Sequence, residues 1–535
     1  MTIQSDDSAR TADWRRRIDP IAVGLFLLGV LVFIRISKLN FLSQDANWDL
    51  LNYHAYVPMA LLNGTWFSDF HPASLPNYLT PYQDLLQWPI ISGLPAPIAT
   101  AVLMAVQVSI FIPIGLILQV TVPGLSRSRA LAVGLIGVSG AMLVTELGIT
   151  MGDVPPAVLI AWALYLLASV LAGRTSRPER RAALAGVLVG AAVALKLTLM
   201  YTAPGLLAVT LILMVAGMRR SALVFLVVAP AAALLFYAPW AIVLQVQMGS
   251  PFFPLYNAVF HATRFPSVNY DTKFPITSLA DLVALPVRQA SGTAITSELQ
   301  FWDARWLAAM LAVGLGLVVG AVRAIRPETR ARWRGRLPAL ALLAFWCISY
   351  VMWAITFGIQ RYAIVLEALA VPVIAIGASL AVPRLPSRAV SLLMLLALAG
   401  LLVGTTKGVD FGRRPMGWAP IVPEEAIEPL SGYDAIVIAS PPLGHLRAIT
   451  RNVPGSSDQA WLGTPFNDAD LAVAEPILRG KSVAIIFFSF DLGSANLAAN
   501  EYGLKMADQC TQFDTPMADS LGLRTVEVCA AYPLP

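Results

Sequence analysis

Long apolar segments alternate with short polar ones over the first three quarters of the chain. An apolar run of about 20 residues is long enough to cross a bilayer as a helix, and such runs recur here at short intervals. The pattern predicts eleven transmembrane helices. They fall at residues 20–39, 96–122, 130–147, 154–173, 182–196, 200–217, 221–244, 304–322, 337–356, 362–382 and 389–406.

Two of these runs, 182–196 and 200–217, can also be read as one helix that is kinked around Lys196 and Pro204. The distribution of Lys and Arg separates the two interpretations. With eleven helices, 20 of these cations fall in loops on one side of the bundle and 8 on the other. Because cytoplasmic loops are enriched in Lys and Arg, this bias predicts a cytoplasmic N-terminus and a C-terminus on the outer side.

The pattern changes after residue 406, where polar and charged residues become as frequent as in a soluble domain. Tyr433–Ala439 and Ser482–Ser489 are short β-branched apolar runs, typical of buried strands, and Leu523–Cys529 alternates as a further strand does. Asp468–Leu478 reads as a helix between them. We therefore predict a small extracytoplasmic α/β domain at 407–535.

The predicted fold is thus mainly α, a polytopic helical bundle with an α/β domain at its C-terminal end. Residues 1–19 form a cytoplasmic tail, and residues 20–406 form the transmembrane domain with long outer loops at 40–95 and 245–303. No small-residue cleavage site follows the first apolar run, so we expect that run to remain as an anchor.

Composition agrees with a membrane location. The chain is 57% hydrophobic and 13% charged, whereas soluble domains carry about 25% charged residues. We expect a bacterial-type inner membrane protein in contact with lipid. The net charge of +5 follows from the loop bias, so it does not indicate a nucleic-acid partner. Cys347 lies in a predicted helix as a packing residue. Cys510 and Cys529 share the outer region, where a disulfide can form, and the sequence leaves their pairing open.

The first outer loop holds the densest group of candidate residues, in the segment Ser43–His54. Asp45 and Asp49 stand there among aromatic residues, and no Lys or Arg occurs between Asn40 and Ala96. A carboxylate at the mouth of a membrane cavity can act as a general base toward an acceptor hydroxyl. The pair could instead hold a divalent cation, or Asp49 could simply cap the helix that follows.

Charged residues at the outer ends of later helices form a second group. Asp153 follows Glu146 by seven residues, and with Pro155 it also makes an ordinary helix start. Lys196 interrupts an apolar run, where it could meet a phosphate or extend to the interface. Arg361 is the only cation in its short outer loop. Its guanidinium matches a phosphate bidentately, although a lone outer Arg can also be an interface anchor.

Arg264, in the second outer loop, is a weaker candidate of the same kind. The chain has no glycine-rich phosphate loop, no His/Cys metal spacing and no Gly-x-Ser-x-Gly elbow. The sequence therefore predicts no cofactor, and it gives no support for a bound metal.

Several motifs, taken in order along the chain, resemble those of the GT-C glycosyltransferases. The resemblance is to the branch of protein O-mannosyltransferases and lipid A aminoarabinose transferases, and it covers roughly residues 20–400. In that branch an Asp closes the first helix, and an interfacial helix follows that ends in a small-residue turn and Trp. The matching residues are Asp49, Tyr53 and Asn63-Gly64-Thr65-Trp66, then Asp153-Val154-Pro155, Ala194-Leu195-Lys196 with Pro204, and Arg361-Tyr362.

The resemblance implies a hexosyl- or pentosyltransferase. It would move a sugar from a polyprenyl-phosphate donor to a glycan, lipid or protein acceptor on the outer face of the membrane. Asp49 would take the acceptor proton. Many members have an acidic residue after this Asp, whereas this chain has Leu50, which leaves Asp45 as the possible second acid. Asp153, Glu146 and Tyr53 would position the acceptor. Lys196, Arg361 and Arg264 would bind the donor phosphate.

Two other classes of function stay open. A transporter or flippase of a lipid-linked sugar would show inverted repeats, broken helices at the midplane and polar residues deep in the bundle. A non-catalytic scaffold of the cell envelope would use the C-terminal domain for recognition, and Leu50 is compatible with it. The polar residues of this sequence gather at the outer edge instead, which favours the glycosyltransferase.

Overall fold

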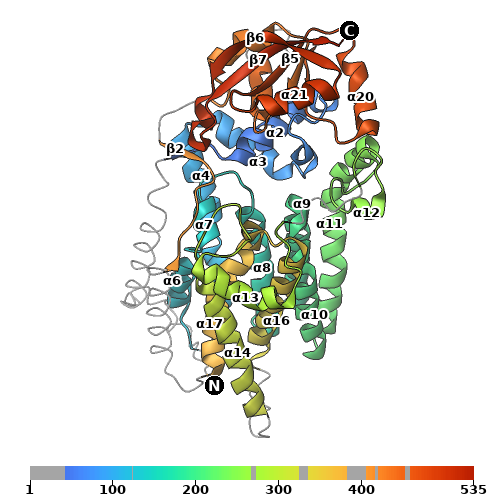
Figure 1. Cartoon of the computed structure of the whole chain (residues 1–535). Coiled ribbons are helices and arrows are strands. Elements are labelled where there is room, and N and C mark those ends of the chain that lie inside the picture. The colour runs from blue at the N-terminus through green and yellow to red at the C-terminus, as the bar shows by residue number, and fades with distance from the viewer. Residues whose placement is uncertain are drawn as a thin grey trace, which may run out of the picture.

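The computed structural model describes residues 43–122, 124–266, 273–324, 335–381, 405–415, 420–451 and 458–534. A long helical bundle carries a sheet domain at one end, with the outer loops between the two (Figure 1). Within the described ranges, six helical segments are long and apolar enough to cross a membrane. They are Ala96–Thr121, Val154–Leu171, Leu197–Val215, Arg219–Met248, Leu337–Thr356 and Gln360–Ala381.

Apart from the runs at 96–122 and 130–147, each of which forms two helices, the described helices follow the predicted runs closely. The run at 20–39 and nearly all of 389–406 lie outside the described residues, so the total of eleven stays a prediction. The bundle helices are α4 (Ala96–Val108), α5 (Phe111–Thr121), α6 (Arg127–Gly137), α7 (Ala141–Glu146), α8 (Val154–Leu171), α9 (Pro178–Leu195), α10 (Ala203–Val215), α11 (Arg219–Met248), α14 (Arg305–Ala324), α16 (Leu337–Thr356) and α17 (Ile364–Ala381).

The predicted separation of 182–196 from 200–217 is confirmed. α9 ends at Leu195, the chain turns through a 3-10 segment at Leu197–Thr202, and α10 follows as a second helix. α9 packs against α8 and α11, whereas α10 packs against α16. Lys196 therefore lies in a turn between two helices, where its side chain can reach the outer end of the bundle.

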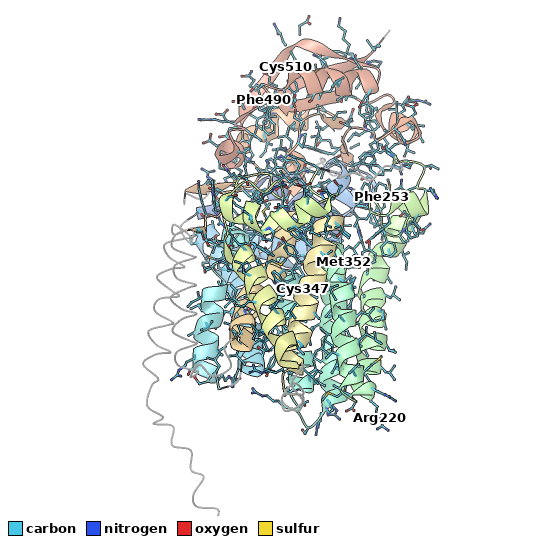
Figure 2. All side chains as sticks on the ribbon, turned by 60° about the horizontal axis from the view of Figure 1, so that its bottom comes forward. Arg220, Phe253, Cys347, Met352, Phe490 and Cys510 are labelled. Atoms are coloured by element: carbon cyan, nitrogen blue, oxygen red, sulfur yellow. A yellow bond between two sulfur atoms is a disulfide. The ribbon has the colours of Figure 1, made fainter. Side chains whose placement is uncertain are left out.

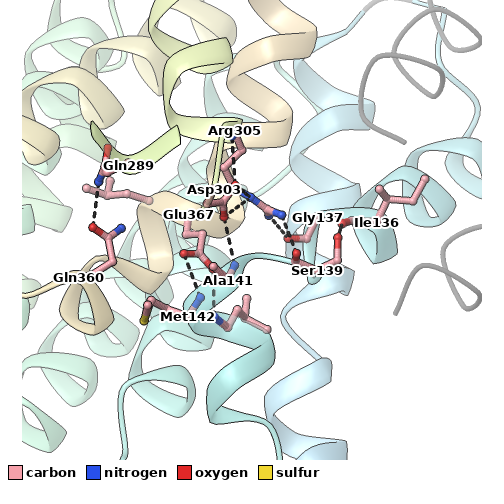
Figure 3. Close-up of polar contacts among 12 residues, drawn as sticks. Ile136, Gly137, Ser139, Ala141, Met142, Gln289, Asp303, Arg305, Gln360 and Glu367 are labelled. Atoms are coloured by element: carbon pink, nitrogen blue, oxygen red, sulfur yellow. Dashed lines mark hydrogen bonds and ion pairs between the residues drawn. The ribbon is translucent and has the colours of Figure 1, made fainter. Parts of the chain in front are cut away.

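The prediction of one helix over 130–147 is wrong, because the chain breaks between Gly137 and Ala141. Figure 3 shows Arg305 beside this break. The Arg305 guanidinium donates to the Gly137 carbonyl at 3.2 Å and to the Ser139 carbonyl at 2.6 Å, and Asp303 pairs with it at 2.7 Å. Inside a membrane protein a broken helix persists only where such groups satisfy its free backbone atoms.

Carboxylates cap the helix that begins after the break. Asp303 accepts the Ala141 amide at 3.0 Å. Glu367, on α17, accepts the amides of Met142 and Leu143 at 3.3 and 3.0 Å (Figure 3). Gly140 makes room for this contact, since a Cβ there would lie 1.8 Å from Glu367 Oε1. The start of α7 is thereby tied to α17.

The first outer loop forms a compact layer above the bundle (Figure 1). The interfacial helix expected near Asp49–Leu62 exists in two parts, a π-helical turn at Leu50–His54 and then α2 at Tyr56–Asn63. Helix α3 spans Tyr82–Gly93, and 3-10 turns lie at Thr65–Phe67 and Leu75–Tyr78. The second outer loop contributes α12 (Asn257–Phe260) and α13 (Leu279–Ser291).

The C-terminal region contains the expected strands and helix. In the described part of the chain it forms a five-stranded sheet of order β4-β3-β5-β7-β6, parallel at β4-β3-β5 and antiparallel at β5-β7-β6. A second, two-stranded sheet pairs the first loop with the segment after the bundle. The elements are β1 (Ser43–Asp45), β2 (Arg413–Pro415), α19 (Ile427–Ser431), β3 (Ala435–Ile438), β4 (Ala460–Leu462), α20 (Asp468–Leu478), β5 (Val483–Phe488), α21 (Leu492–Glu501), β6 (Leu504–Asp514) and β7 (Thr525–Pro533).

The pairing left open by the sequence is made in the structure, where Cys510 and Cys529 form a disulfide between β6 and β7. Figure 2 places Cys510 in the sheet domain, Cys347 within the bundle and Arg220 at the opposite end of the molecule. The cation-rich α10–α11 connection and the C-terminal domain thus lie at opposite ends, as the predicted topology requires.

The C-terminal domain and the outer loops share one hydrophobic core. The backbone of Phe70 extends the sheet edge, because its amide donates to Trp461 O at 2.8 Å and its carbonyl accepts from Gly463 at 2.6 Å. Asp69 accepts from the Arg447 guanidinium at 3.0 Å, and neither side chain is exposed. The first outer loop is therefore held rigidly against the C-terminal domain.

Candidate functional site

The first outer loop is shaped by hydrogen bonds within its own sequence. Asn47 Oδ1 accepts the Leu50 amide at 2.8 Å and so caps the π-helical turn. Asp49 makes no capping bond, so the alternative in which it serves as a helix cap is wrong. The turn closes with the Ala55 amide donating to Leu50 O at 3.1 Å. π-Helical turns are frequent at functional sites. This one contains Tyr53 and His54 and determines where their side chains lie.

Four of the predicted site residues, far apart in sequence, meet above the bundle. Arg361 Nη1 lies 2.9 Å from Asp49 Oδ2 and 3.8 Å from Asp153 Oδ2. Lys196 Nζ forms an ion pair with the other oxygen of Asp153. The Tyr362 ring lies near both cations, with its centroid 5.0 Å from Lys196 Nζ and 5.2 Å from Arg361 Cζ. The result is a chain of alternating charges, Asp49–Arg361–Asp153–Lys196.

The charges of this chain are largely removed from water. The side chains of Asp49 and Arg361 are 10% and 13% exposed, and that of Asp153 is 3% exposed. Burial alone would raise the pKa of Asp49. The Arg361 guanidinium, with smaller contributions from His54 and Lys196, outweighs burial and holds the pKa of Asp49 below its ordinary value. Asp49 is therefore an ionised partner of Arg361 at neutral pH.

A cavity opens beside these charges. We call it the polar cavity. Asp49 and Asp153 are not among the described residues that line it; they lie behind the two cations. Its wall includes Tyr53, His54, Tyr78, Gln83, Asp84, Lys196, Phe253, Arg361 and Tyr362. The cavity thus presents cations, aromatic rings, an imidazole and the Asp84 carboxylate to a ligand.

A second, apolar space runs between α9, α10 and α11. We call it the apolar groove. Leu197 lines both it and the polar cavity, so the two spaces adjoin at the turn after Lys196. Its rim reaches the outside of the bundle, because Leu207 is 49% and Leu234 68% exposed. Other residues that line it are Val189, Met200, Leu206, Phe225, Tyr237 and Phe252.

The remaining predicted residues lie at different distances from the cavity. Tyr53 lines it directly. Glu146 lies behind it, fully buried, where its Oε2 accepts the Asp153 amide at 3.1 Å. Asp45 is occupied elsewhere: one oxygen accepts the amide and hydroxyl of Thr150, both at 2.8 Å, and the other accepts the side-chain amide of Asn47 at 2.7 Å. Its contacts are those of a residue that fixes the loop before Asp153.

Arg264 does not join the other two cations. Its Nε lies 2.8 Å from Asp470 Oδ1 on α20, and its Nη1 donates to Gln247 O at 3.0 Å. Asp470 also pairs with His71 at 2.8 Å, and His71 contacts the Tyr78 hydroxyl. Arg264 thus belongs to a cluster that joins the C-terminal domain to the cavity wall at Tyr78.

Two residues of the cavity wall were missed by sequence reasoning. His54 Nδ1 lies 2.6 Å from Asp84 Oδ1, and both residues line the polar cavity. The position of His54, five residues after Asp49 in the same loop, was a usable signal. Asp84 had no such signal in the sequence, because its partner His54 is 30 residues away and only the folded loop brings the two together.

No protein-family model matches the chain, and no curated protein sequence matches it. Among solved structures, ArnT from Cupriavidus metallidurans superposes over nearly the whole length. The form bound to undecaprenyl phosphate gives a TM-score of 0.50 at 14% identity, over 95% of this chain and 97% of that one. The apo form gives 0.51 at 13% identity, over 95% and 98%.

The oligosaccharyltransferase of Archaeoglobus fulgidus superposes more loosely in its apo form. It gives a TM-score of 0.49 at 12% identity, over 94% of this chain and 70% of that one. The fold assignment rests on the ArnT structures, which belong to the branch that the motifs predicted. The chain therefore has the fold of ArnT, and six of its described helical segments are long and apolar enough to cross a membrane.

Proposed function

We propose that the protein is a membrane glycosyltransferase that moves a sugar from a polyprenyl-phosphate carrier to an acceptor on the outer face of the membrane. The observation that carries this proposal is the junction of the two spaces. A cavity with Lys196 and Arg361 on its wall adjoins, at Leu197, an apolar groove between helices. A polyprenyl-phosphate sugar consists of an apolar tail, a phosphate and a sugar. This order matches the apolar groove, the two cations and the polar cavity.

Lys196 and Arg361 would bind the carrier phosphate. An Arg fork and a Lys ammonium both suit phosphate oxygens, and Asp49 and Asp153 hold the two cations in place before the ligand arrives. When the bond between sugar and phosphate breaks, negative charge grows on the phosphate. Fixed cations that face such charge typically contribute several kcal/mol to the transition state. Each carboxylate therefore has a role as the holder of a cation.

The carrier tail would lie in the apolar groove. Apolar side chains line it, and its exposed rim at Leu207 and Leu234 would face lipid, so a tail could enter from the bilayer. ArnT of the same fold has been solved with undecaprenyl phosphate bound, which supports a carrier of this class. Because the tail would come from lipid and not from water, van der Waals packing would hold it in the groove.

The sugar would occupy the polar cavity. Tyr53, Tyr78 and Tyr362 offer ring faces, and Gln83 offers a side-chain amide. The transferred group would be a hexosyl or pentosyl unit. The acceptor, a glycan, lipid or protein, would approach from the side of the outer loops.

A lipid-linked sugar transporter is the competing function, and one observation favours it. The break between α6 and α7 and the buried Arg305, Asp303 and Glu367 are features that a transporter interior would have. Against it, the free backbone groups that Figure 3 shows at the break are taken by these side chains, which is expected of a fixed structural joint. Activity separates the two functions.

The test uses purified protein in nanodiscs with a panel of polyprenyl-phosphate sugars and candidate acceptors. Mass spectrometry follows the carrier phosphate that is released. Wild type is compared with Arg361→Gln and with a matched control, Arg288→Gln, at a partly exposed Arg on α13 outside the polar cavity. We expect release by wild type and the control, and a loss of about 100-fold or more in Arg361→Gln. No release from any donor, with lipid-linked sugar moved across sealed vesicles, would establish the transporter instead.

A further inference from the structure

We propose that His54, oriented by Asp84, is the group that accepts the acceptor's proton, and that Asp49 serves to hold Arg361. This inference rests on the proposed function and assigns the proton within it. The structural basis is that the imidazole lies on the cavity wall while the Asp49 carboxylate lies behind a cation.

The first observation is the geometry of the pair. His54 and Asp84 are 7% and 5% exposed, and both line the polar cavity together with Lys196 and Arg361. His54 Nδ1 lies 2.6 Å from Asp84 Oδ1. With the carboxylate ionised, this contact requires a proton on Nδ1, so in the neutral ring Nε2 carries the lone pair. A carboxylate that fixes the tautomer and stabilises the imidazolium is the arrangement of a general base.

The second observation is that the other ring nitrogen has nothing to bind. His54 Nε2 is buried and has no hydrogen-bond partner among the described residues. A buried polar atom left unpaired costs about 1–3 kcal/mol, so native proteins rarely keep one unless a ligand or water completes it. An acceptor hydroxyl in the cavity is a suitable donor to this nitrogen.

The third observation concerns Asp49. Its Oδ2 is engaged by Arg361 at 2.9 Å, and it is not among the described residues that line the cavity. Arg361 also keeps the pKa of Asp49 low against the effect of burial. A carboxylate with a lowered pKa is a weak base at neutral pH. Asp49 is therefore better suited to holding a cation than to taking a proton.

The transfer step then balances as follows. The acceptor oxygen forms a bond to the anomeric carbon of the sugar, and its proton passes to His54 Nε2. The bond between the anomeric carbon and the phosphate oxygen breaks, and its electron pair stays on the phosphate, beside Lys196 and Arg361. The imidazolium is stabilised by Asp84 and returns its proton to solvent after the product leaves. No oxidant, reductant or further reactant is needed.

The test measures kcat/KM for carrier-phosphate release as a function of pH in wild type, His54→Ala and Asp84→Asn. The matched control is His261→Ala, at an exposed histidine of the second outer loop. We expect His54→Ala to lose about 100-fold or more, as loss of a general base does, while the control keeps the wild-type rate. The acid limb of the wild-type profile should disappear in His54→Ala. The charged and titratable groups that share the cavity wall with His54 or interact with it electrostatically are Asp49, Asp84, Lys196, Arg361 and Tyr53, and each is kept in the His54 variant.

Added imidazole distinguishes a base from a packing residue. Free imidazole should restore at least tenfold of the rate in His54→Ala and none in Asp84→Asn, because only the first variant lacks the base itself. Asp84→Asn keeps the side-chain volume and still reports on the pair should His54→Ala fold poorly. A wild-type rate and pH profile in both variants would overturn the assignment to His54 while the proposed function stands. Absence of release in wild type would overturn the proposed function, and the assignment with it.

Discussion

Gly140 offers a sharp test of how the broken helix is held. In Gly140→Ala the new Cβ would lie 1.8 Å from Glu367 Oε1 and 2.4 Å from its Cδ, so the carboxylate must move away. The backbone of Gly140, at φ −64° and ψ 150°, is open to any residue, so conformational strain adds nothing. The cost therefore arises from the contacts that Glu367 loses.

Glu367 would give up its bonds to the Met142 and Leu143 amides, at 3.3 and 3.0 Å. Hydrogen bonds to a charged group contribute about 1.5–3 kcal/mol each, and the longer bond is at the weak end of that range. We expect a loss of about 3 kcal/mol. For a protein of this size a loss of that order lowers the thermal midpoint by several degrees.

The matched control is Gly137→Ala, three residues earlier. A Cβ there would meet its nearest atoms at 3.5 Å, which is ordinary van der Waals contact. Thermal unfolding of both variants in the same detergent is followed by intrinsic fluorescence. Adding Glu367→Ala removes the carboxylate, so Gly140→Ala should cost little in that background. Equal midpoints for the two glycine variants, or full additivity in the double variant, would refute the reasoning.

Three further predictions follow from the outer layer. Burial raises the pKa of Asp69 to about 6 despite Arg447, so the folded state binds a proton more readily than the unfolded state, and stability should fall as pH rises through 6. In Asp69→Asn the free energy of unfolding, measured by chemical denaturation, should depend less on pH in this range. The same pH dependence as in the wild type would contradict the prediction. Replacing both Cys510 and Cys529 by Ser should lower the free energy of unfolding of the C-terminal domain by about 3 kcal/mol, measured as a lower denaturation midpoint. An unchanged midpoint would contradict this prediction. Tyr78→Phe keeps its ring on the cavity wall but loses the contact with His71, so KM for the donor should rise about fivefold, equivalent to about 1 kcal/mol, whereas an unchanged KM would exclude a positioning role.

Much of the fold was predictable because its causes are local. Apolar length gives the bundle helices, and short β-branched runs give β3 and β5, since both signals lie within each segment. The helix at 130–147 could not be predicted correctly. The groups that satisfy its break come from Arg305 and Glu367, more than 160 residues along the chain. The hydrophobicity of residues 130–147 alone therefore does not indicate the break.

The candidate site divides in the same way. Asp49, Asp153, Lys196 and Arg361 were identifiable by type and by their position at the outer edge, because a charge beside a membrane span needs a reason. Their pairing could not be identified from the sequence, since 312 residues separate Arg361 from Asp49. Sequence also could not tell that Asp49 lies behind Arg361, because that depends on the π-helical turn and on the position of α17.

The C-terminal domain contributes to the candidate site through three consecutive residues of the first outer loop. Asp69 binds Arg447 by its side chain, Phe70 pairs with the β4 edge by its backbone, and His71 binds Asp470 by its side chain. His71 adopts a positive φ of 42°, which non-glycine residues hold only where their surroundings fix them. Its other nitrogen contacts the Tyr78 hydroxyl, and Tyr78 lines the polar cavity. Since each link is buried, a shift of the C-terminal domain must move the cavity wall, so the domain is part of the site's structure.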